Sequence, residues 1–144
     1  MDESTTRKLD ELLKSIDSEK EMERFMELPK VSGVWRSFPD YYRSLEPVLA
    51  MDSSDIIRLS GLERSYYYQV MKGTRQPGRD KVLRLCLAAG LDLGQTTRAL
   101  ELSRNAALYP RNRRDIILTV AVNQKAGVID ANLLLDKYGE EPLA

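Results

Sequence analysis

Residues 53–77, SSDIIRLSGLERSYYYQVMKGTRQP, decide the fold expected for this chain. Two short amphipathic segments, 53–60 and 64–72, lie on either side of the corner Ser60-Gly61-Leu62. The glycine can adopt the left-handed backbone conformation that such a corner needs, and the leucine can fill the gap between two helices. The stretch therefore predicts two short helices that meet at a tight turn.

Helical patterns continue on both sides of this corner, and no stretch alternates like a strand for long. Gly73 is expected to end the second helix of the pair. One amphipathic helix is expected over 5–28, which a break at Asp17-Ser18 can divide into two. Further helices are expected from Ser37 with Pro39 in its first turn, and near 79–89, 93–103, 112–125 and 130–138. The chain is therefore expected to belong to the all-α class.

Single residues predict where several of these helices begin and end. Asp92 and Gln95 have the spacing of a capping box. Pro47 is expected to end or kink the helix that starts at Ser37. Glycines expected to stop helices are Gly90, Gly127 and Gly139. The face of the helix from Ser37 that is expected to be buried consists of Phe38, Tyr41, Tyr42, Leu45 and Leu49.

The pattern divides the chain into three parts. Residues 1–33 are an amphipathic helical segment ending in a linker at 29–33, residues 34–104 contain the corner, and residues 105–144 are a helical extension expected to pack on the same domain. The apolar stripe of the first part must be buried somewhere, because short isolated helices are marginal in water. We expect this part to pack on the domain, to mediate dimerisation or to bind a partner protein.

Composition excludes several kinds of chemistry. The chain of 144 residues has no histidine and one cysteine, Cys86, which lies among apolar residues and is expected to be a small buried hydrophobe. This composition excludes zinc fingers and Cys/His catalytic pairs. The sequence contains no phosphate-binding glycine loop and no nucleophile–base pair. We therefore expect no enzyme activity, no metal and no cofactor.

Two sequence features bear on the cellular compartment. No apolar stretch approaches the length of a membrane span. The first residues, Met1-Asp2-Glu3-Ser4, lack the pattern of a signal peptide. A cytoplasmic protein without membrane contact is expected.

Charge is unevenly distributed along a chain whose net charge is zero. Residues 1–54 carry 12 acidic and 8 basic residues, whereas residues 55–144 carry 10 and 14. A local basic face suits an anionic partner, and an ordinary solvated surface accounts for it equally well. The cluster of Arg111, Arg113 and Arg114 at an expected helix start favours a structural network of ion pairs over an anion site.

Residues 37–94 resemble the DNA-binding domain of the Cro/phage-repressor-like, or lambda-repressor-like, helix-turn-helix proteins. The features that carry the resemblance are the helix start at Asp52-Ser53, the corner at 60–62, the segment 63–72, the tail Lys72-Gly73-Thr74-Arg75-Gln76-Pro77, and Leu83 through Leu91. Residues 108–115 and 138–143 resemble an extension found in a less characterised group of bacterial proteins of this type. The resemblance implies a lambda-repressor-like bundle with added N- and C-terminal helices.

The resemblance also implies which residues contact DNA. In the family, the first residues of the second motif helix contact base edges in the major groove. The matching positions here are Arg64, Ser65, Tyr66, Tyr68 and Gln69. Arginine can pair with guanine and glutamine with adenine. Positions that usually hold the phosphate backbone are Ser53, Lys72 and Arg75.

Two positions depart from the family's pattern. Ile57 stands where a small alanine usually allows the helices to approach, and Tyr67 stands where a branched aliphatic residue usually packs. Both residues are bulkier, so the helix pair is expected to be more splayed. Tyr67 is expected in the core, because Leu62, Val70 and Met71 share its face, and Tyr66 and Tyr68 are then expected to be exposed.

Two functional hypotheses follow. The first is a sequence-specific DNA-binding protein, a bacterial transcriptional regulator that places the helix near 64–72 in the major groove of double-stranded DNA and acts as a homodimer. The second is a protein-interaction module that reuses the same fold without binding DNA. Its partner would bind through the N-terminal helix or through the exposed tyrosines.

Overall fold

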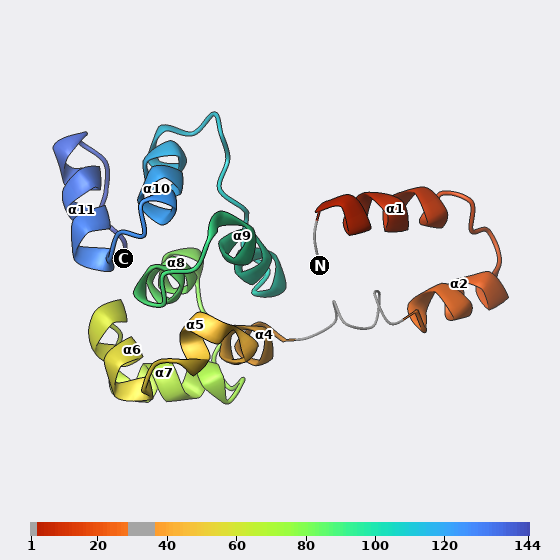
Figure 1. The fold of residues 1–144 in the computed structure, drawn as a ribbon, viewed down its shortest axis with the longest axis horizontal. Coiled ribbons are helices and arrows are strands. Elements are labelled where there is room, and N and C mark those ends of the chain that lie inside the picture. Colours follow the sequence, from red (N-terminus) through yellow and green to blue (C-terminus); the bar gives the residue numbers. More distant parts are fainter. Residues whose placement is uncertain (1–2, 29–36) are drawn as a thin grey trace. The chain divides into compact units, whose positions relative to one another are not determined.

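The computed structural model describes residues 3–28 and 37–144, and within these ranges the chain is helical and contains no strand (Figure 1). The chain divides into two compact units, Met1–Arg36 and Ser37–Ala144. The expected linker at residues 29–33 lies outside the described residues. In the described ranges, no helix has both the length and the apolar character required to cross a membrane.

The first unit contains the helices α1 (Glu3–Leu13) and α2 (Glu19–Met26), so the expected break at Asp17-Ser18 is confirmed. Ser18 has an extended backbone and its hydroxyl accepts a hydrogen bond from the Glu21 amide at 3.2 Å, which starts a new helix. None of the side chains described in this unit is buried, and Leu12, Leu13 and Met22 are exposed.

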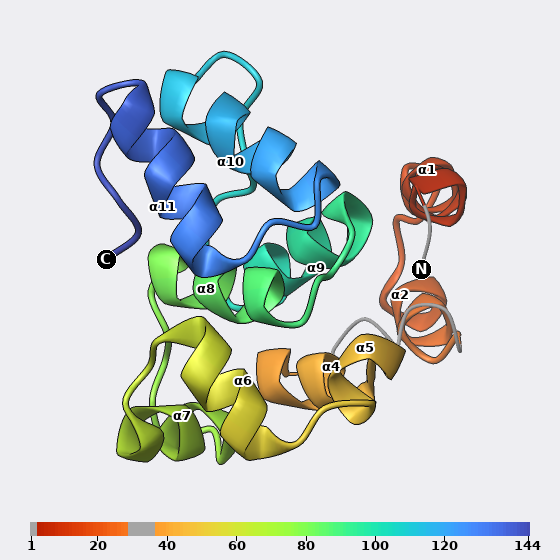
Figure 2. The same ribbon diagram turned by 60° about the vertical axis from the view of Figure 1, so that its left-hand side comes forward.

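The second unit is a helical bundle that packs around one core. Its helices are α4 (Phe38–Ser44), α5 (Glu46–Leu49), α6 (Ser53–Ser60), α7 (Arg64–Met71), α8 (Arg79–Ala88), α9 (Leu93–Leu102), α10 (Arg113–Asn123) and α11 (Val128–Lys137). Helix α8 is central, because it packs against α6, α9 and α11 (Figure 2). Its residues Val82, Leu83, Leu85 and Cys86 are almost fully buried, as expected.

The corner between α6 and α7 has the expected form. Gly61 has a φ of +73°, the left-handed region, and directly follows α6. The Ser60 hydroxyl donates to the Ile57 carbonyl at 3.1 Å and accepts from the Leu62 amide at 3.3 Å. Leu62 is buried between the helices. The sequence 60–62 therefore forms a turn that is closed by its own hydrogen bonds and anchored by one leucine.

The chain breaks at Pro47, as predicted. Ser37 caps α4, Phe38 and Tyr42 are buried, α4 ends at Ser44, and Pro47 lies in the first turn of a separate helix, α5. A proline clashes with the carbonyl four residues earlier and is favoured in a first helical turn, so the chain restarts there. The restart buries Val48 and leaves Leu49 68% exposed, so the predicted burial of Leu49 is wrong.

Three helices end at a glycine with a positive φ, as expected: Gly73, Gly90 and Gly139. The prediction for Gly127 is wrong, because this residue has a φ of −78° and is the N-cap of α11. Helix α10 ends instead through Lys125, whose φ is +56°. The Lys125 ammonium donates to the Gly90 carbonyl at 3.0 Å, a contact that helps to offset the cost of this backbone conformation.

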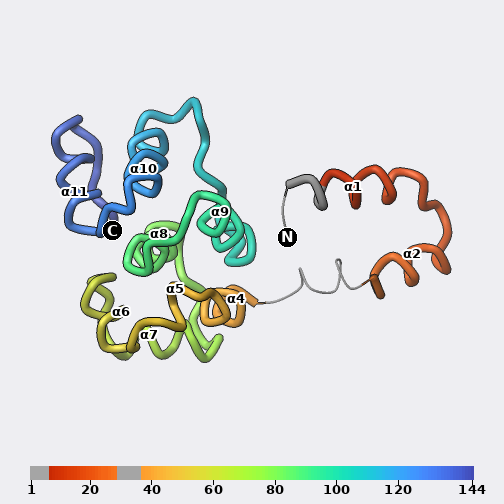
Figure 3. The backbone as a smooth tube through the Cα atoms, in the orientation of Figure 1, coloured from red at the N-terminus to blue at the C-terminus, as the bar shows by residue number. Residues whose placement is uncertain are grey.

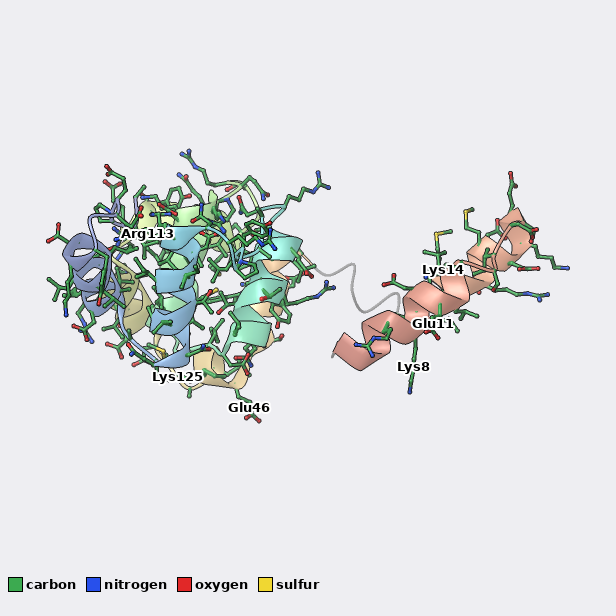
Figure 4. The ribbon with its side chains drawn as sticks, turned by 90° about the horizontal axis from the view of Figure 1, so that it is seen from above. Lys8, Glu11, Lys14, Glu46, Arg113 and Lys125 are labelled. Atoms are coloured by element: carbon green, nitrogen blue, oxygen red, sulfur yellow. The ribbon has the colours of Figure 1, made fainter. Side chains whose placement is uncertain are left out.

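Helices α10 and α11 pack against each other and onto α9 and α8. Figure 4 labels Arg113, the first residue of α10, and Lys125, which lies just beyond its last turn. Arg113 pairs with Glu140 at 3.3 Å and Arg114 with Asp80 at 2.9 Å, as expected of a structural network. Arg111, the third member of the cluster, is exposed.

Candidate nucleic-acid interface

The core determines which face of α7 is turned outward. Tyr67, Val70 and Met71 are buried, and their spacing of three and four residues places them on one side of the helix. Helix α7 lies at the periphery of the second unit, away from α10 and α11, in both views and along the backbone trace (Figure 1, Figure 2, Figure 3). The opposite side of α7 is thus left to solvent.

The outward side of α7 carries most of the residues predicted to contact DNA. Arg64 and Ser65 are exposed in its first turn, and Gln69 and Lys72 are exposed further along. Tyr68 is 38% exposed and its ring meets that of the buried Tyr67 edge to face, with 5.3 Å between the centroids. These five side chains belong to α7 and its C-cap, and all of them are exposed to solvent on the side opposite the core.

Ser53 is the one predicted contact residue on the neighbouring helix. It is exposed at the first position of α6. The preceding residue, Asp52, is the N-cap and makes no side-chain capping hydrogen bond. The amides of the first turn of α6 thus lack a side-chain acceptor at the cap position.

Tyr66 differs from the expectation, since it is half-buried and packs against the core. On the helix it lies at the border between the buried side and the outward side. The guanidinium carbon of Arg75 lies 5.5 Å from the centre of its ring, a cation–π arrangement. The prediction of an exposed Tyr66 is therefore wrong, because the core covers the side chain on one side and Arg75 on the other.

Arg75 returns to α7 because of the turn at Gly73. Gly73 has a φ of +80°, its amide donates to the Val70 carbonyl, and the Thr74 amide donates to the Gln69 carbonyl, each at 3.0 Å. This is a Schellman end, which reverses the chain over the last turn of the helix. Arg75 Nε then donates to Oε1 of Gln69 at 3.2 Å. Tyr66, Gln69 and Arg75 thus form one cluster, which we call the Arg75 clamp.

The loop that carries Arg75 is fastened to the rest of the second unit. The amide nitrogen of the Gln76 side chain donates to the Ser103 carbonyl, and that of Asn105 donates to the Pro77 carbonyl at 3.2 Å. Thr74 adds a hydroxyl hydrogen bond to the Gln69 carbonyl at 3.1 Å. Gln76, Asn105 and Thr74 were not among the predicted functional residues. No local sequence pattern indicates contacts that join two loops so far apart in the chain.

The surface around α7 carries more basic than acidic residues. Between residues 63 and 76 the only acid is Glu63, against Arg64, Lys72 and Arg75. The nearest acid on α6, Asp55, is engaged by Arg58 at 3.3 Å. Glu63 is the N-cap of α7 and makes no side-chain capping hydrogen bond. An anion that approaches α7 therefore meets Arg64 and the helix N-terminus beside Glu63 at one end, and Lys72 and Arg75 at the other.

In the described part of the chain, no group of three His, Cys, Asp or Glu residues is arranged to hold a metal ion. An open groove of about 330 Å³ lies at the start of α10 and is lined by Arg111, Arg113, Ile116, Ile117 and Tyr138. Its lining is mostly apolar and includes two arginines.

Comparisons of the chain with protein-family models, with curated proteins and with solved structures found no match. The surface of α7 with the Arg75 clamp combines exposure, positive charge and side chains with hydrogen-bond donors and acceptors.

Proposed function

We propose that the second unit is a lambda-repressor-like helix-turn-helix domain that binds double-stranded DNA of specific sequence and regulates transcription in a bacterium. The observation that carries this proposal is the outward face of α7. It holds Arg64, Ser65, Gln69 and Lys72 as exposed side chains while Tyr67, Val70 and Met71 anchor the helix in the core. A helix with its side chains is about 10–12 Å wide, and the major groove is about 12 Å wide.

Each exposed residue has a role in this proposal. Arg64 donates two parallel hydrogen bonds to the acceptors of guanine, and Ser65 bonds to a base or a phosphate. Ser53 and Lys72 contact phosphates on either side of the groove. Such contacts position the protein and make its affinity fall as salt rises. Two copies on half-sites about one helical turn apart would give the specificity of a palindromic operator.

The test is a selection of bound duplexes from a random library, followed by anisotropy titrations at two salt concentrations. Arg64→Ala and Gln69→Ala are expected to weaken binding to the selected duplex by about tenfold each, because each removes a base contact. Lys137→Gln in α11 serves as a matched control that loses one positive charge away from α7. Circular dichroism must show that the variants are folded. Failure of the unchanged protein to enrich any duplex at low salt would reject the proposal.

A second candidate function is a protein-interaction module. The first unit favours it, because Leu12, Leu13 and Met22 are exposed and no side chain described there is buried. Figure 4 shows Lys8, Glu11 and Lys14 around α1, so this helix combines charged and apolar surface. A pull-down from which Met22→Ser removes a protein partner, with no duplex enriched by the same preparation, would favour this candidate over DNA binding.

A further inference from the structure

We infer that the Arg75 clamp makes Gln69 recognise guanine, although a free glutamine would be expected to pair with adenine. The inference rests on the proposed function, since it names the base that one residue of the same surface selects. It depends on the direction in which the carboxamide of Gln69 is held.

The chemistry of the clamp determines that direction. A guanidinium has only N–H donors, so its partner on Gln69 must be the carboxamide oxygen and not the nitrogen. Arg75 Nε lies 3.2 Å from that oxygen. The guanidinium carbon also lies 5.5 Å from the ring centre of Tyr66, which limits where the arginine can go. The oxygen of Gln69 is therefore directed toward Arg75, and its NH₂ group is left to contact another partner.

Backbone contacts fix Arg75 relative to Gln69. The amides of Thr74 and Arg75 both donate to the Gln69 carbonyl, at 3.0 and 3.3 Å, and the Thr74 hydroxyl donates to it at 3.1 Å. Gly73 supplies the left-handed turn that permits this return of the chain. The end of the helix itself thus places the backbone of Arg75 next to Gln69.

The two purines require different partners. Adenine offers an acceptor and an amino donor in the major groove, so its glutamine partner needs a free oxygen as well as a free nitrogen. Guanine offers two acceptors, N7 and O6. With the oxygen of Gln69 held by Arg75, the adenine amino group would have to approach an oxygen that already lies beside a positive charge. The NH₂ group of Gln69, with the guanidinium next to it, presents donors alone and matches guanine.

The test compares base preferences from random-duplex selections for the unchanged chain and three variants. Gln69→Leu locates the base that residue 69 contacts, because preference is lost at that position only. The unchanged protein is expected to prefer guanine there. Arg75→Met, which removes the donor but keeps the stem, is expected to change the preference to adenine by about tenfold, the size of one base contact.

A matched control separates the clamp from an ordinary phosphate contact. Lys72→Met removes a neighbouring exposed cation that takes no part in the clamp. It is expected to weaken binding to all sequences equally and to lower the salt dependence by about one phosphate contact. If Arg75→Met behaves like Lys72→Met and leaves every base preference intact, the inference is overturned while the proposed function stands. Absence of any enriched duplex for the unchanged protein overturns both.

Discussion

Arg84 and Ser60 are joined by a hydrogen bond that links the central helix to the corner between α6 and α7. Nη1 of Arg84 donates to the Ser60 carbonyl at 2.9 Å, while Nη2 and Nε donate to the backbone oxygens of Leu143 and Ala144, each at 2.8 Å. Leu143 is itself buried. One guanidinium therefore supplies a hydrogen-bond donor to the last carbonyl of α6 and holds residues 143–144 against α8.

Arg84→Met is expected to lower the free energy of unfolding by about 3 kcal/mol, because three backbone oxygens lose a charged donor at once. Denaturant unfolding followed by circular dichroism measures the change. Arg43→Met is a suitable control, since Arg43 forms only an exposed pair with Asp40 at 3.4 Å. The control should cost less than about 0.5 kcal/mol. Equal effects of the two substitutions would show that the three-way contact contributes nothing.

Gly61→Ala is expected to destabilise the second unit by about 1–2 kcal/mol through the left-handed backbone alone. An added Cβ would also lie 2.8 Å from Nη1 of Arg84 and would displace it. Both substitutions therefore disturb the same Arg84 contact. The double variant should lose less stability than the sum of the losses in the two single variants. Gly78→Ala, at an N-cap with an ordinary φ and open space around it, should cost less than Gly61→Ala. Strict additivity of Gly61→Ala and Arg84→Met would contradict the coupling.

Much of this fold could be predicted because its signals are local. Gly61 needs only its own backbone conformation, and the Asp92–Gln95 capping box is formed as expected, with both hydrogen bonds present. The mistakes at Leu49 and Gly127 have a different origin. Periodicity placed Leu49 on a continuous helix, but the restart at Pro47 rotated the following residues. Either end of a loop can hold a glycine, and Lys125 took the left-handed position that Gly127 was expected to fill.

Acid is expected to destabilise the second unit through Asp80 and Asp115. Burial alone would raise the pKa of each carboxyl group, but hydrogen bonds from Arg114 and Ala144 to Asp80, and from Arg79 and Tyr109 to Asp115, outweigh it and lower both pKa values. A carboxylate with a lowered pKa in the folded state stabilises the protein above its unfolded pKa of about 4. That stabilisation is lost as the pH falls through the lower folded values.

The measurement is the free energy of unfolding from pH 7 down to pH 2. A plateau is expected above about pH 5, followed by a decline as the two groups are protonated. Asp115→Asn should reduce the decline and should also lower stability at pH 7, because the guanidinium of Arg79, 2.7 Å from the carboxylate, is left partly buried without its charge partner. A stability that rises as the pH falls below 4 would contradict the assignment.

The candidate interface could be predicted from the sequence less fully than the fold could. The resemblance to helix-turn-helix proteins implied Arg64, Ser65 and Gln69 as candidates, and the core contacts of Tyr67 turn them outward. The half-burial of Tyr66 and the contact between Arg75 and Gln69 depend on how the chain returns after Gly73. Such returns are set by hydrogen bonds between residues five or six positions apart, which no helical or strand period reveals.

Cys86 offers a probe of the whole core. Burial raises the pKa of its thiol to about 12, and the side chain lies on the inner face of α8 between Leu85 and Leu87. At pH 8 only about one thiol in ten thousand would then be ionised in the folded protein, whereas an unfolded chain with an ordinary pKa of about 8.5 has roughly a quarter. Reaction with a disulfide reagent should therefore proceed through unfolding. Its rate should rise in Arg84→Met and Gly61→Ala in proportion to the fraction unfolded, and it should not change in Arg43→Met. Complete reaction of the native protein within seconds, with no dependence on stability, would show that the thiol is reached without opening the core.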